Sequence, residues 1–284
     1  MTACTEGNYT AHDGVQLRTL TWEPEGTPRG AFLIAHGLGE HGGRYGHVAA
    51  PLVAAGFVVR ALDHRGHGRS TGLRGHVDRF EEFTRDLSGV LAAFRAEFPD
   101  LPTLLYGHSL GGLIVLSHHL HHPDHGLDGL VLSNPLIATA FEPPKIKAAA
   151  GRLLSRFVPR LRLDNELDTS QLSRDPAEVK AYEDDPLVHR LISTRLFTEM
   201  FGAADVLATS ADRFRLPTLW IFGEADAIVS AAAGRAFADK LPAGSTTIRA
   251  WPATYHEPHN DLDKAEVIAA IVEWATGRLE AAGA

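Results

Sequence analysis

The sequence contains a single cysteine, Cys4, among its 284 residues. One thiol cannot form a disulfide within the chain, and it supplies no cysteine-based metal signature. Positive charge is scarce as well: 27 lysines and arginines stand against 35 aspartates and glutamates, which gives a net charge of −8. Because nucleic-acid binding depends on attraction to phosphates, we expect no nucleic-acid partner.

Long hydrophobic runs are also missing. No stretch approaches the roughly 18 uninterrupted apolar residues that a transmembrane helix needs. The opening residues, MTACTEGNYT, have neither a basic start nor an apolar core, so they do not resemble a signal peptide. With 44% hydrophobic and 22% charged residues, the composition is that of an ordinary globular protein. We therefore expect a soluble, cytoplasmic protein with a sizeable core.

Short apolar runs alternate with longer segments of helical periodicity along most of the chain. The runs predict strands over 15–22, 30–37, 57–63, 103–107, 127–134, 217–223 and 245–251. The periodic segments predict helices over 47–55, 80–98, 110–121, 231–241 and 263–279. Such alternation is typical of an α/β fold in which a mostly parallel sheet is covered by helices on both faces.

One region, residues 137–214, breaks this alternation. It contains several helical patterns but no convincing buried strand. We interpret it as a helical cap, or lid, inserted over the ends of the strands. Residues 1–136 and 215–284 would then form the core of the protein.

The pattern G-x-S-x-G occurs twice, around Ser70 and around Ser109. Chance gives roughly 0.1 such matches in a chain of this composition, so the context has to decide which is functional. Ser109 follows an apolar strand directly and opens an apolar helix, as a nucleophilic serine on a strand-to-helix turn does. Ser70 lies in a polar, glycine-rich loop, where a structural role is the simpler interpretation. Ser109 is therefore the predicted nucleophile.

A serine hydroxyl is a weak nucleophile and needs a base that is oriented by an acid. In α/β-hydrolase folds the chain order is serine, acid, histidine. Asp226 follows a predicted strand and is the favoured acid, with Glu224 as the alternative. His256 is favoured over His259 as the base because it lies in the loop after the final strand.

The transition state also needs hydrogen-bond donors for its oxyanion. One is the backbone N–H of the residue after the nucleophile, Leu110. The other should come from the loop after the strand 30–37, which gives Leu38. Every part of a serine hydrolase site thus has a candidate, whereas a non-catalytic binding module would show a broken triad.

Six blocks of sequence, in order, resemble the monoacylglycerol lipase and lysophospholipase-like branch of the α/β-hydrolases. They are HGLGEHGGRY (36–45), LDHRGHGRS (62–70), GHSLGG (107–112), DPLVH (185–189), GEAD (223–226) and YHEPHND (255–261). The resemblance implies an α/β-hydrolase fold with an eight-stranded sheet and a helical cap. It also implies hydrolysis of a monoacylglycerol-type ester without a cofactor. By position, the family's triad corresponds to Ser109, Asp226 and His256, and its oxyanion amides to Leu38 and Leu110.

The same resemblance implies a polar pocket for the glycerol head group. Glu40, Arg44 and His259 match this pocket by position. The alternative is a structural salt bridge that steadies the oxyanion loop, and the sequence leaves both open. Glu257 and the Asn260-Asp261 pair are common in lysophospholipase-like members instead. A lysophospholipase or a general carboxylesterase therefore stays as the alternative function.

Two further segments invite functional interpretations. The histidine-rich stretch 117–125 has histidines four residues apart, but no carboxylate-and-histidine signature completes a metal site, so we expect a polar helix end and no metal. The stretch 143–163 has apolar residues at helical spacing and no acidic residue. It is either a packed cap helix or a helix that touches a membrane surface peripherally. Its basic residues are Lys145, Lys147, Arg152, Arg156, Arg160 and Arg162.

Overall fold

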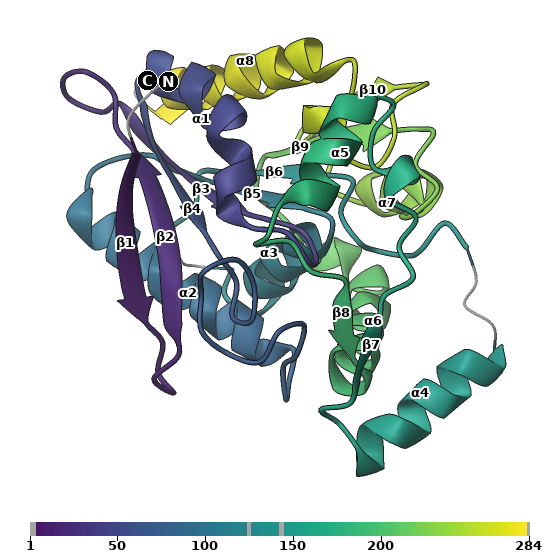
Figure 1. The fold of residues 1–284 in the computed structure, drawn as a ribbon. Coiled ribbons are helices and arrows are strands. Elements are labelled where there is room, and N and C mark those ends of the chain that lie inside the picture. The colour runs from purple at the N-terminus through teal and green to yellow at the C-terminus, as the bar shows by residue number, and fades with distance from the viewer. Residues whose placement is uncertain (1–3, 124–125, 142–144, 283–284) are drawn as a thin grey trace.

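The computed structural model describes residues 4–123, 126–141 and 145–282, and an eight-stranded sheet forms its centre (Figure 1). The strands are β1 (Cys4–Thr10), β2 (Gln16–Trp22), β3 (Gly30–Ala35), β4 (Phe57–Leu62), β5 (Thr103–His108), β6 (Gly129–Ser133), β9 (Thr218–Gly223) and β10 (Thr246–Trp251). Their order is β1-β2-β4-β3-β5-β6-β9-β10. The strands from β4 to β10 pair in parallel, and β1 and β2 form an antiparallel edge. The predicted mostly parallel eight-stranded sheet is thus confirmed.

Helices cover both faces of the sheet (Figure 1). The helices of the core are α1 (Gly46–Ala54), α2 (Glu81–Glu97), α3 (Leu110–His121), α7 (Ala231–Ala238) and α8 (Lys264–Ala282). Helices α1 and α8 pack on one face, and α2, α3 and α7 pack on the other. Strands buried on both faces read as continuous apolar runs, which explains why the sequence located most of them within one or two residues.

The sequence-based prediction missed the first strand, β1. Its residues, CTEGNYT, show no apolar alternation, and most of its side chains are exposed. Backbone pairing with β2 at the edge of the sheet holds this strand in place. An edge strand without a buried face leaves no periodic signal in the sequence.

Between β6 and β9 the chain leaves the sheet. This inserted region contains α4 (Lys145–Phe157), β7 (Arg162–Asp164), η2 (Thr169–Gln171), α5 (Pro176–Asp184), β8 (Leu191–Ser193), α6 (Thr194–Ala208) and η3 (Ala211–Arg213). Helix α6 buries Leu196, Met200 and Leu207 in the same apolar cluster as α3, whereas α4 lies farther from the sheet (Figure 1). The remaining short helices, η1 (Gly42–Tyr45) and η4 (Pro258–Asn260), lie in loops of the core.

The short strands β7 and β8 form a separate two-stranded antiparallel ribbon. Each has three residues, and the side chains of β7 are exposed, so no buried-strand pattern marks them in the sequence. The assignment of residues 137–214 to a cap stays a prediction. Among the residues that the structure describes, no helix is both long enough and apolar enough to cross a membrane.

Candidate active site

Ser109 lies on a sharp turn between the end of β5 and the start of α3. Its backbone has φ 51° and ψ −117°, a conformation that residues other than glycine rarely adopt. Gly111 allows the turn to pack closely, because a Cβ there would overlap the carbonyl oxygen of Ala35. A Cβ at Gly112 would lie 2.6 Å from the Cβ of Pro135. The glycines around Ser109 therefore let a strained serine sit at the carboxyl end of the sheet.

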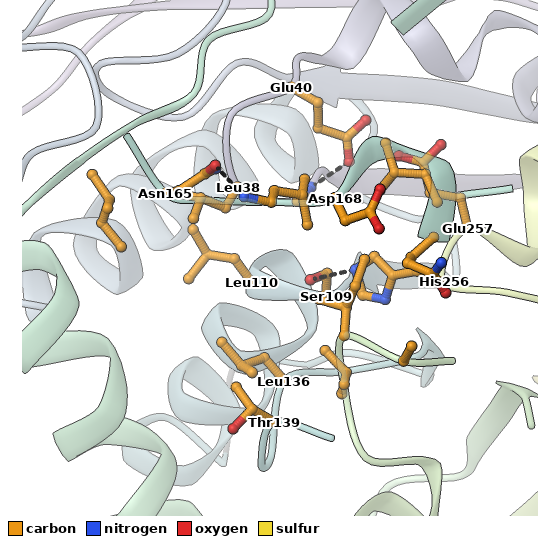
Figure 2. Close-up of a pocket in the computed structure, with 18 of the residues that line it drawn as sticks. Leu38, Glu40, Ser109, Leu110, Leu136, Thr139, Asn165, Asp168, His256 and Glu257 are labelled. Carbon is orange, nitrogen blue, oxygen red and sulfur yellow. Dashed lines mark hydrogen bonds between the residues drawn. The ribbon is translucent and has the colours of Figure 1, made fainter. Parts of the chain in front are cut away.

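His256 connects Ser109 and Asp226. Its Nε2 lies 3.0 Å from Ser109 Oγ (Figure 2). Its Nδ1 lies 2.7 Å from Asp226 Oδ2. The other carboxylate oxygen of Asp226 accepts hydrogen bonds from the backbone N–H groups of Ile228, at 2.7 Å, and Val229, at 2.9 Å. All three members of the predicted triad are buried. A base within reach of the nucleophile, and an acid that orients the base, make the arrangement that nucleophilic catalysis requires.

The two alternatives that the sequence left open lie elsewhere. The carboxylate of Glu224 is half-exposed and pairs with Arg235. The hydroxyl of Ser70 donates to the carbonyl oxygen of Asp63 at 2.6 Å and accepts from the N–H of Arg18 at 2.7 Å. These contacts give Ser70 a structural role in its loop, and they place Glu224 away from the histidine.

The carboxylate of Asp226 stabilises the protonated form of His256, which arises when the proton of Ser109 is transferred to it. Burial alone would lower the pKa of His256, but the Asp226 carboxylate beside its Nδ1 raises this pKa overall. The ring of His108 lies 4.9 Å from that of His256. Burial, reinforced by His256, lowers the pKa of His108 to about 3, so His108 stays neutral beside the base. The Nδ1–H of His108 donates to the carbonyl oxygen of Ser133 at 3.0 Å. In this neutral tautomer the Nε2 of His108 is a hydrogen-bond acceptor.

The two predicted oxyanion amides lie beside Ser109. Leu110 is the first residue of α3, so its N–H has no acceptor within the helix. Leu38 lies in the loop after β3, where Glu40 Oε1 accepts the N–H of Gly37 at 2.6 Å. A Cβ at Gly37 would lie 3.4 Å from the Cβ of Ser109, so this loop lies directly against the nucleophile. Leu38 and Leu110 line the same cavity as Ser109. Their amides are therefore near the point where an oxyanion would develop.

A second buried network surrounds Arg44. Its guanidinium binds Glu257 in a bidentate pair, at 2.8 and 2.7 Å, and Glu40 at 2.7 Å. The ring of Tyr182 covers the guanidinium at 4.7 Å. Burial raises the pKa of Glu40. Burial would also raise the pKa of Glu257, but the charge and hydrogen bonds of Arg44 lower it overall. With both carboxylates ionised, the set of Glu40, Arg44 and Glu257 carries a net charge of −1, counted from its formal charges.

His259, the third residue predicted for the head-group pocket, forms no hydrogen bond between its ring and Arg44, Glu40 or Glu257. Its ring stacks on Tyr45 at 4.8 Å, and its Nδ1 lies 3.3 Å from the hydroxyl of Tyr106. It is fully buried and is not among the described residues that line the cavity, whereas Glu40 and Glu257 are. The sequence analysis did not select Glu257 as a site residue. The available signal was its position directly after His256, because a neighbour of the base must lie near the site.

A cavity of about 340 Å³ opens in front of Ser109. Figure 2 shows Glu40 and Glu257 on one side of the serine, and Leu136 and Thr139 on the other. Glu40, His108 and Glu257 bring three acceptor atoms within 4.8 Å of one another in the polar part of the cavity, and Asn165, Glu166, Asp168 and Gln171 of the inserted region also line it. The rest of the wall is mostly apolar and includes Leu38, Leu110, Leu136, Leu172, Ile192, Phe197, Met200, Phe201, Ile228 and Val229.

Comparison with known proteins identifies the family. The model of the family described as serine aminopeptidase, S33, matches residues 26–263. The chain belongs to this hydrolase family. A monoacylglycerol lipase of Mycolicibacterium smegmatis is 32% identical over 275 residues, which cover 96% of this chain and 98% of that protein. The solved structure of Paleococcus ferrophilus monoacylglycerol lipase is 36% identical, with a TM-score of 0.85, over 92% of this chain and 99% of that one.

These likenesses confirm the branch that the sequence motifs indicated. The chain is a serine hydrolase of the α/β-hydrolase superfamily, in the branch of the monoacylglycerol lipases. A Dictyostelium discoideum abhydrolase domain-containing protein is 36% identical over 274 residues. The match covers 96% of this chain but 29% of the Dictyostelium protein, so the hydrolase unit also occurs within a longer chain.

Among the residues of this hydrolase that the structure describes, one group brings three possible metal-ligand atoms within 4.8 Å of one another. It consists of Glu40, His108 and Glu257. Both carboxylates already bind Arg44, and the third member is the neutral imidazole of His108. All three side chains can accept hydrogen bonds, so the group also suits hydroxyl donors. In the histidine-rich stretch 117–125, His118 Nε2 lies 2.8 Å from Ser88 Oγ. Residues 124 and 125 of that stretch lie outside the described residues.

Asn134 is another residue that the sequence analysis missed. It follows β6 with a positive φ of 38°, which asparagine tolerates better than most residues. Its Oδ1 accepts the N–H of Gly223 at 3.1 Å, and its Nδ2 donates to the carbonyl oxygens of Tyr255, at 3.3 Å, and His256, at 3.1 Å. This side chain therefore joins the end of β9 to the loop that carries His256.

Proposed function

We propose that this protein hydrolyses monoacylglycerols to glycerol and a free fatty acid, through an acyl-enzyme intermediate on Ser109. The cavity supports this proposal because it has an apolar wall for an acyl chain and the clustered acceptors Glu40, His108 and Glu257 for a diol, with Ser109 between them. Relatives in the same family that are named monoacylglycerol lipases point in the same direction.

The geometry supports a two-step mechanism. Ser109 Oγ attacks the ester carbonyl carbon while His256 Nε2 takes its proton, and Asp226 stabilises the imidazolium. The carbonyl oxygen becomes an oxyanion that accepts hydrogen bonds from the N–H groups of Leu38 and Leu110. When the tetrahedral intermediate collapses, glycerol leaves with the proton from His256. Water then attacks the acyl-enzyme in the same way, and the fatty acid and free Ser109 are released.

The polar side of the cavity suits the head group of a monoacylglycerol. Glu40, His108 and Glu257 are acceptors, and the two free hydroxyls of the substrate are donors. With both carboxylates ionised, the set of Glu40, Arg44 and Glu257 has a net charge of −1 and would repel an anionic phosphate. This charge favours a monoacylglycerol over an anionic lysophospholipid, the main alternative. It would attract a peptide amino terminus, so aminopeptidase substrates belong in the test.

The test is a comparison of kcat/KM for substrates that share one acyl chain. We expect the monoacylglycerol to exceed the matching lysophosphatidylglycerol by at least about tenfold, the effect of 1.4 kcal/mol. Hydrolysis of an alanine arylamide should be negligible beside both. Faster turnover of the lysophospholipid would assign the alternative function, and faster turnover of the arylamide would make the protein an aminopeptidase.

We further propose that α4 contacts the surface of a membrane or micelle from which the substrate enters. Leu153 is 58% exposed and Phe157 is 77% exposed on this helix, although apolar side chains of a packed cap helix would be covered. Arg152 and Arg156 are exposed on the same helix. Each basic residue near an anionic surface contributes up to about 1 kcal/mol, and the apolar side chains can insert shallowly.

Vesicle co-sedimentation tests this contact. Wild-type protein should bind anionic phosphatidylglycerol vesicles more strongly than neutral ones, and Leu153→Asp should weaken binding by about tenfold, because a charge replaces an inserted leucine. Val206→Asp is the matched control, since Val206 is 54% exposed on α6. Equal losses from both variants, or no vesicle binding at low salt, would leave α4 as a lid without a lipid contact.

A further inference from the structure

We propose that residues 169–193 of the inserted region position the catalytic loops, and that Asp185 is a positioning residue for the oxyanion loop. The inference rests on the proposed function, because it takes Ser109, His256 and the amide of Leu38 as the reacting groups. It also divides the predicted cap into a part joined to the catalytic core and a part, α4, whose described contacts are with α6.

The first half of this segment holds the loop that carries His256. The backbone N–H of His256 donates to the carbonyl oxygen of Gln171 at 3.3 Å, and that of Glu257 donates to Leu172 at 2.9 Å. The hydroxyl of Ser173 donates to the carbonyl oxygen of Asn260 at 2.9 Å. The loop of the base is therefore bonded to the inserted chain on one side, through successive backbone groups.

The second half of the segment holds the oxyanion loop. The N–H of His189 donates to the carbonyl oxygen of Gly39 at 2.8 Å. Asp185 Oδ2 lies 2.8 Å from Nε2 of His41, in the same loop. The carboxylate of Glu40 holds the loop on the other side of Leu38, at Gly37. Leu38 thus lies between two restrained residues, and the inserted region supplies one of the restraints.

Glycines in the core let the inserted chain come into backbone contact. Gly39 has φ +81°, and a Cβ there would overlap the carbonyl oxygen of His189. Gly75 has φ +62°, and a Cβ there would overlap the carbonyl oxygen of Leu191. The N–H of Ser193 donates to the carbonyl oxygen of Gly75 at 2.8 Å. With no side chain between the two backbones, the inserted segment cannot shift without disturbing the core loops.

Helix α4 contacts a different part of the protein. Gly151 faces Phe197, a Cβ at Gly151 lying 3.5 Å from that ring, and Arg195 donates to the carbonyl oxygen of Ser155 at 3.0 Å. Both partners are on α6, within the same inserted region. Substitutions on α4 therefore act at a distance from the oxyanion loop, whereas substitutions at residues 185–193 act on it directly.

Asp185 offers the sharpest test because its neighbour is a matched control. Asp184 precedes it at the end of α5, is exposed, and pairs with Lys180 on its own helix. Asp185→Asn removes the charge that faces His41 with almost no change in shape. His41→Gln removes the same contact from the side of the core. Asp184→Asn makes the same chemical change one residue away, without a partner in the oxyanion loop.

The readouts are kcat and KM for a p-nitrophenyl ester, and the Ki of an alkyl trifluoromethyl ketone. Ser109 Oγ adds to the ketone carbonyl carbon, the proton passes to His256, and the former carbonyl oxygen becomes an oxyanion at the same amides. We expect Asp185→Asn to lower kcat by about 10- to 100-fold, since small misplacements cost this much, and to change KM by less than about twofold. Its Ki should rise by the same factor as kcat falls.

Three further outcomes decide the proposal. If Asp185 acts through His41, the double variant should be no worse than either single variant. If Asp185→Asn matches Asp184→Asn in kcat and Ki, the contact is packing only and the proposal is overturned. If Asp185→Asn does not fold, as thermal unfolding would show, His41→Gln decides by the same criteria. A wild-type protein without ester hydrolysis would instead contradict the proposed function.

Discussion

Two buried polar networks meet at the cavity, and they differ in when they carry charge. At rest, the network of Ser109, His256 and Asp226 carries only the negative charge of Asp226. When the serine proton moves to His256, a positive imidazolium and a negative oxyanion form. Arg44 is paired with both of its carboxylates before any substrate arrives. The first network is built to change during the reaction, and the second is complete beforehand. We therefore expect substitutions in the first to alter kcat, and substitutions in the second to alter which ester is held.

The two networks are nevertheless joined through the chain. Glu257 follows His256 directly, and Glu40 accepts the N–H of Gly37 beside Leu38. Each carboxylate of the static network is thus bonded to a loop that carries part of the reactive one. A purely structural role for Arg44 predicts equal losses on all esters, whereas a head-group role predicts losses confined to substrates with a diol.

The largest expected effect is that of Ser109→Ala. It should reduce ester hydrolysis by at least about 10⁴-fold, because only the oxyanion amides and substrate binding would continue to assist the reaction. Ser70 also lies in a G-x-S-x-G pattern, but Ser70→Ala should retain most activity, since the Ser70 hydroxyl bonds the backbone of Asp63 and Arg18. Initial rates with a p-nitrophenyl ester decide between them. The reverse order of losses would refute the assignment of the nucleophile.

The next effect in size is that of Asp226→Asn. Without the carboxylate, the histidine is no longer held in the orientation and in the tautomer that leave Nε2 free to accept the serine proton. The kcat should therefore fall by about 10³- to 10⁴-fold. Glu224→Gln is the matched control, because its partner is Arg235 on the surface. Steady-state kinetics with both variants, after their thermal stability has been checked, gives the comparison. Similar losses in the two would mean that the acid has been assigned wrongly.

A smaller effect separates the two networks. Glu257→Gln should lower kcat/KM for a monoacylglycerol by about 1–3 kcal/mol, or about 5- to 150-fold, more than for a p-nitrophenyl ester, because the latter has no diol. Glu25→Gln, an exposed loop position, is the control. A parallel loss on both esters would support the structural interpretation of the Arg44 network.

Sequence patterns predicted the fold well where burial decides the structure. Strands β3, β4, β5 and β9 are buried along their whole length, and their apolar runs were visible for that reason. Strand β1 has no buried face and was missed. Residues 185–189 were recognised as a motif, and residues 190–193 were not. The role of this segment depends on backbone contacts with Gly39 and Gly75, which are distant in sequence.

The candidate site divides in the same way. The contacts among Ser109, His256 and Asp226 could be anticipated because the chain order and the strand ends restrict each candidate to very few positions. For the head-group pocket, the sequence analysis selected His259 and not Glu257, although both follow the base within three residues. Packing decides between them: the ring of His259 stacks on Tyr45, and the carboxylate of Glu257 reaches Arg44 at the cavity. A pattern of residues does not specify the direction of a side chain in a short loop.

The smallest expected effect concerns pH, and it tests whether the static network influences the reactive one. His256 must be neutral to accept the proton of Ser109, so activity should fall as pH drops through its pKa. That pKa is raised above the ordinary 6.5: burial lowers it, but Asp226 and, less strongly, the charges of Glu257 and Glu40 raise it. The acid limb of kcat/KM should therefore lie above about pH 6.5.

Removing the charge of Glu257 should move this limb to lower pH. On a p-nitrophenyl ester, Glu257→Gln should then be relatively more active at acidic pH than wild type, each being scaled to its own plateau. The gain at about pH 6 should be less than about tenfold, because tenfold would need 1.4 kcal/mol from a charge that is not bonded to the imidazole. A full pH profile of both proteins, with Glu25→Gln as control, measures it. An unchanged limb would mean that Arg44 neutralises Glu257 completely, and that the two networks are electrostatically independent.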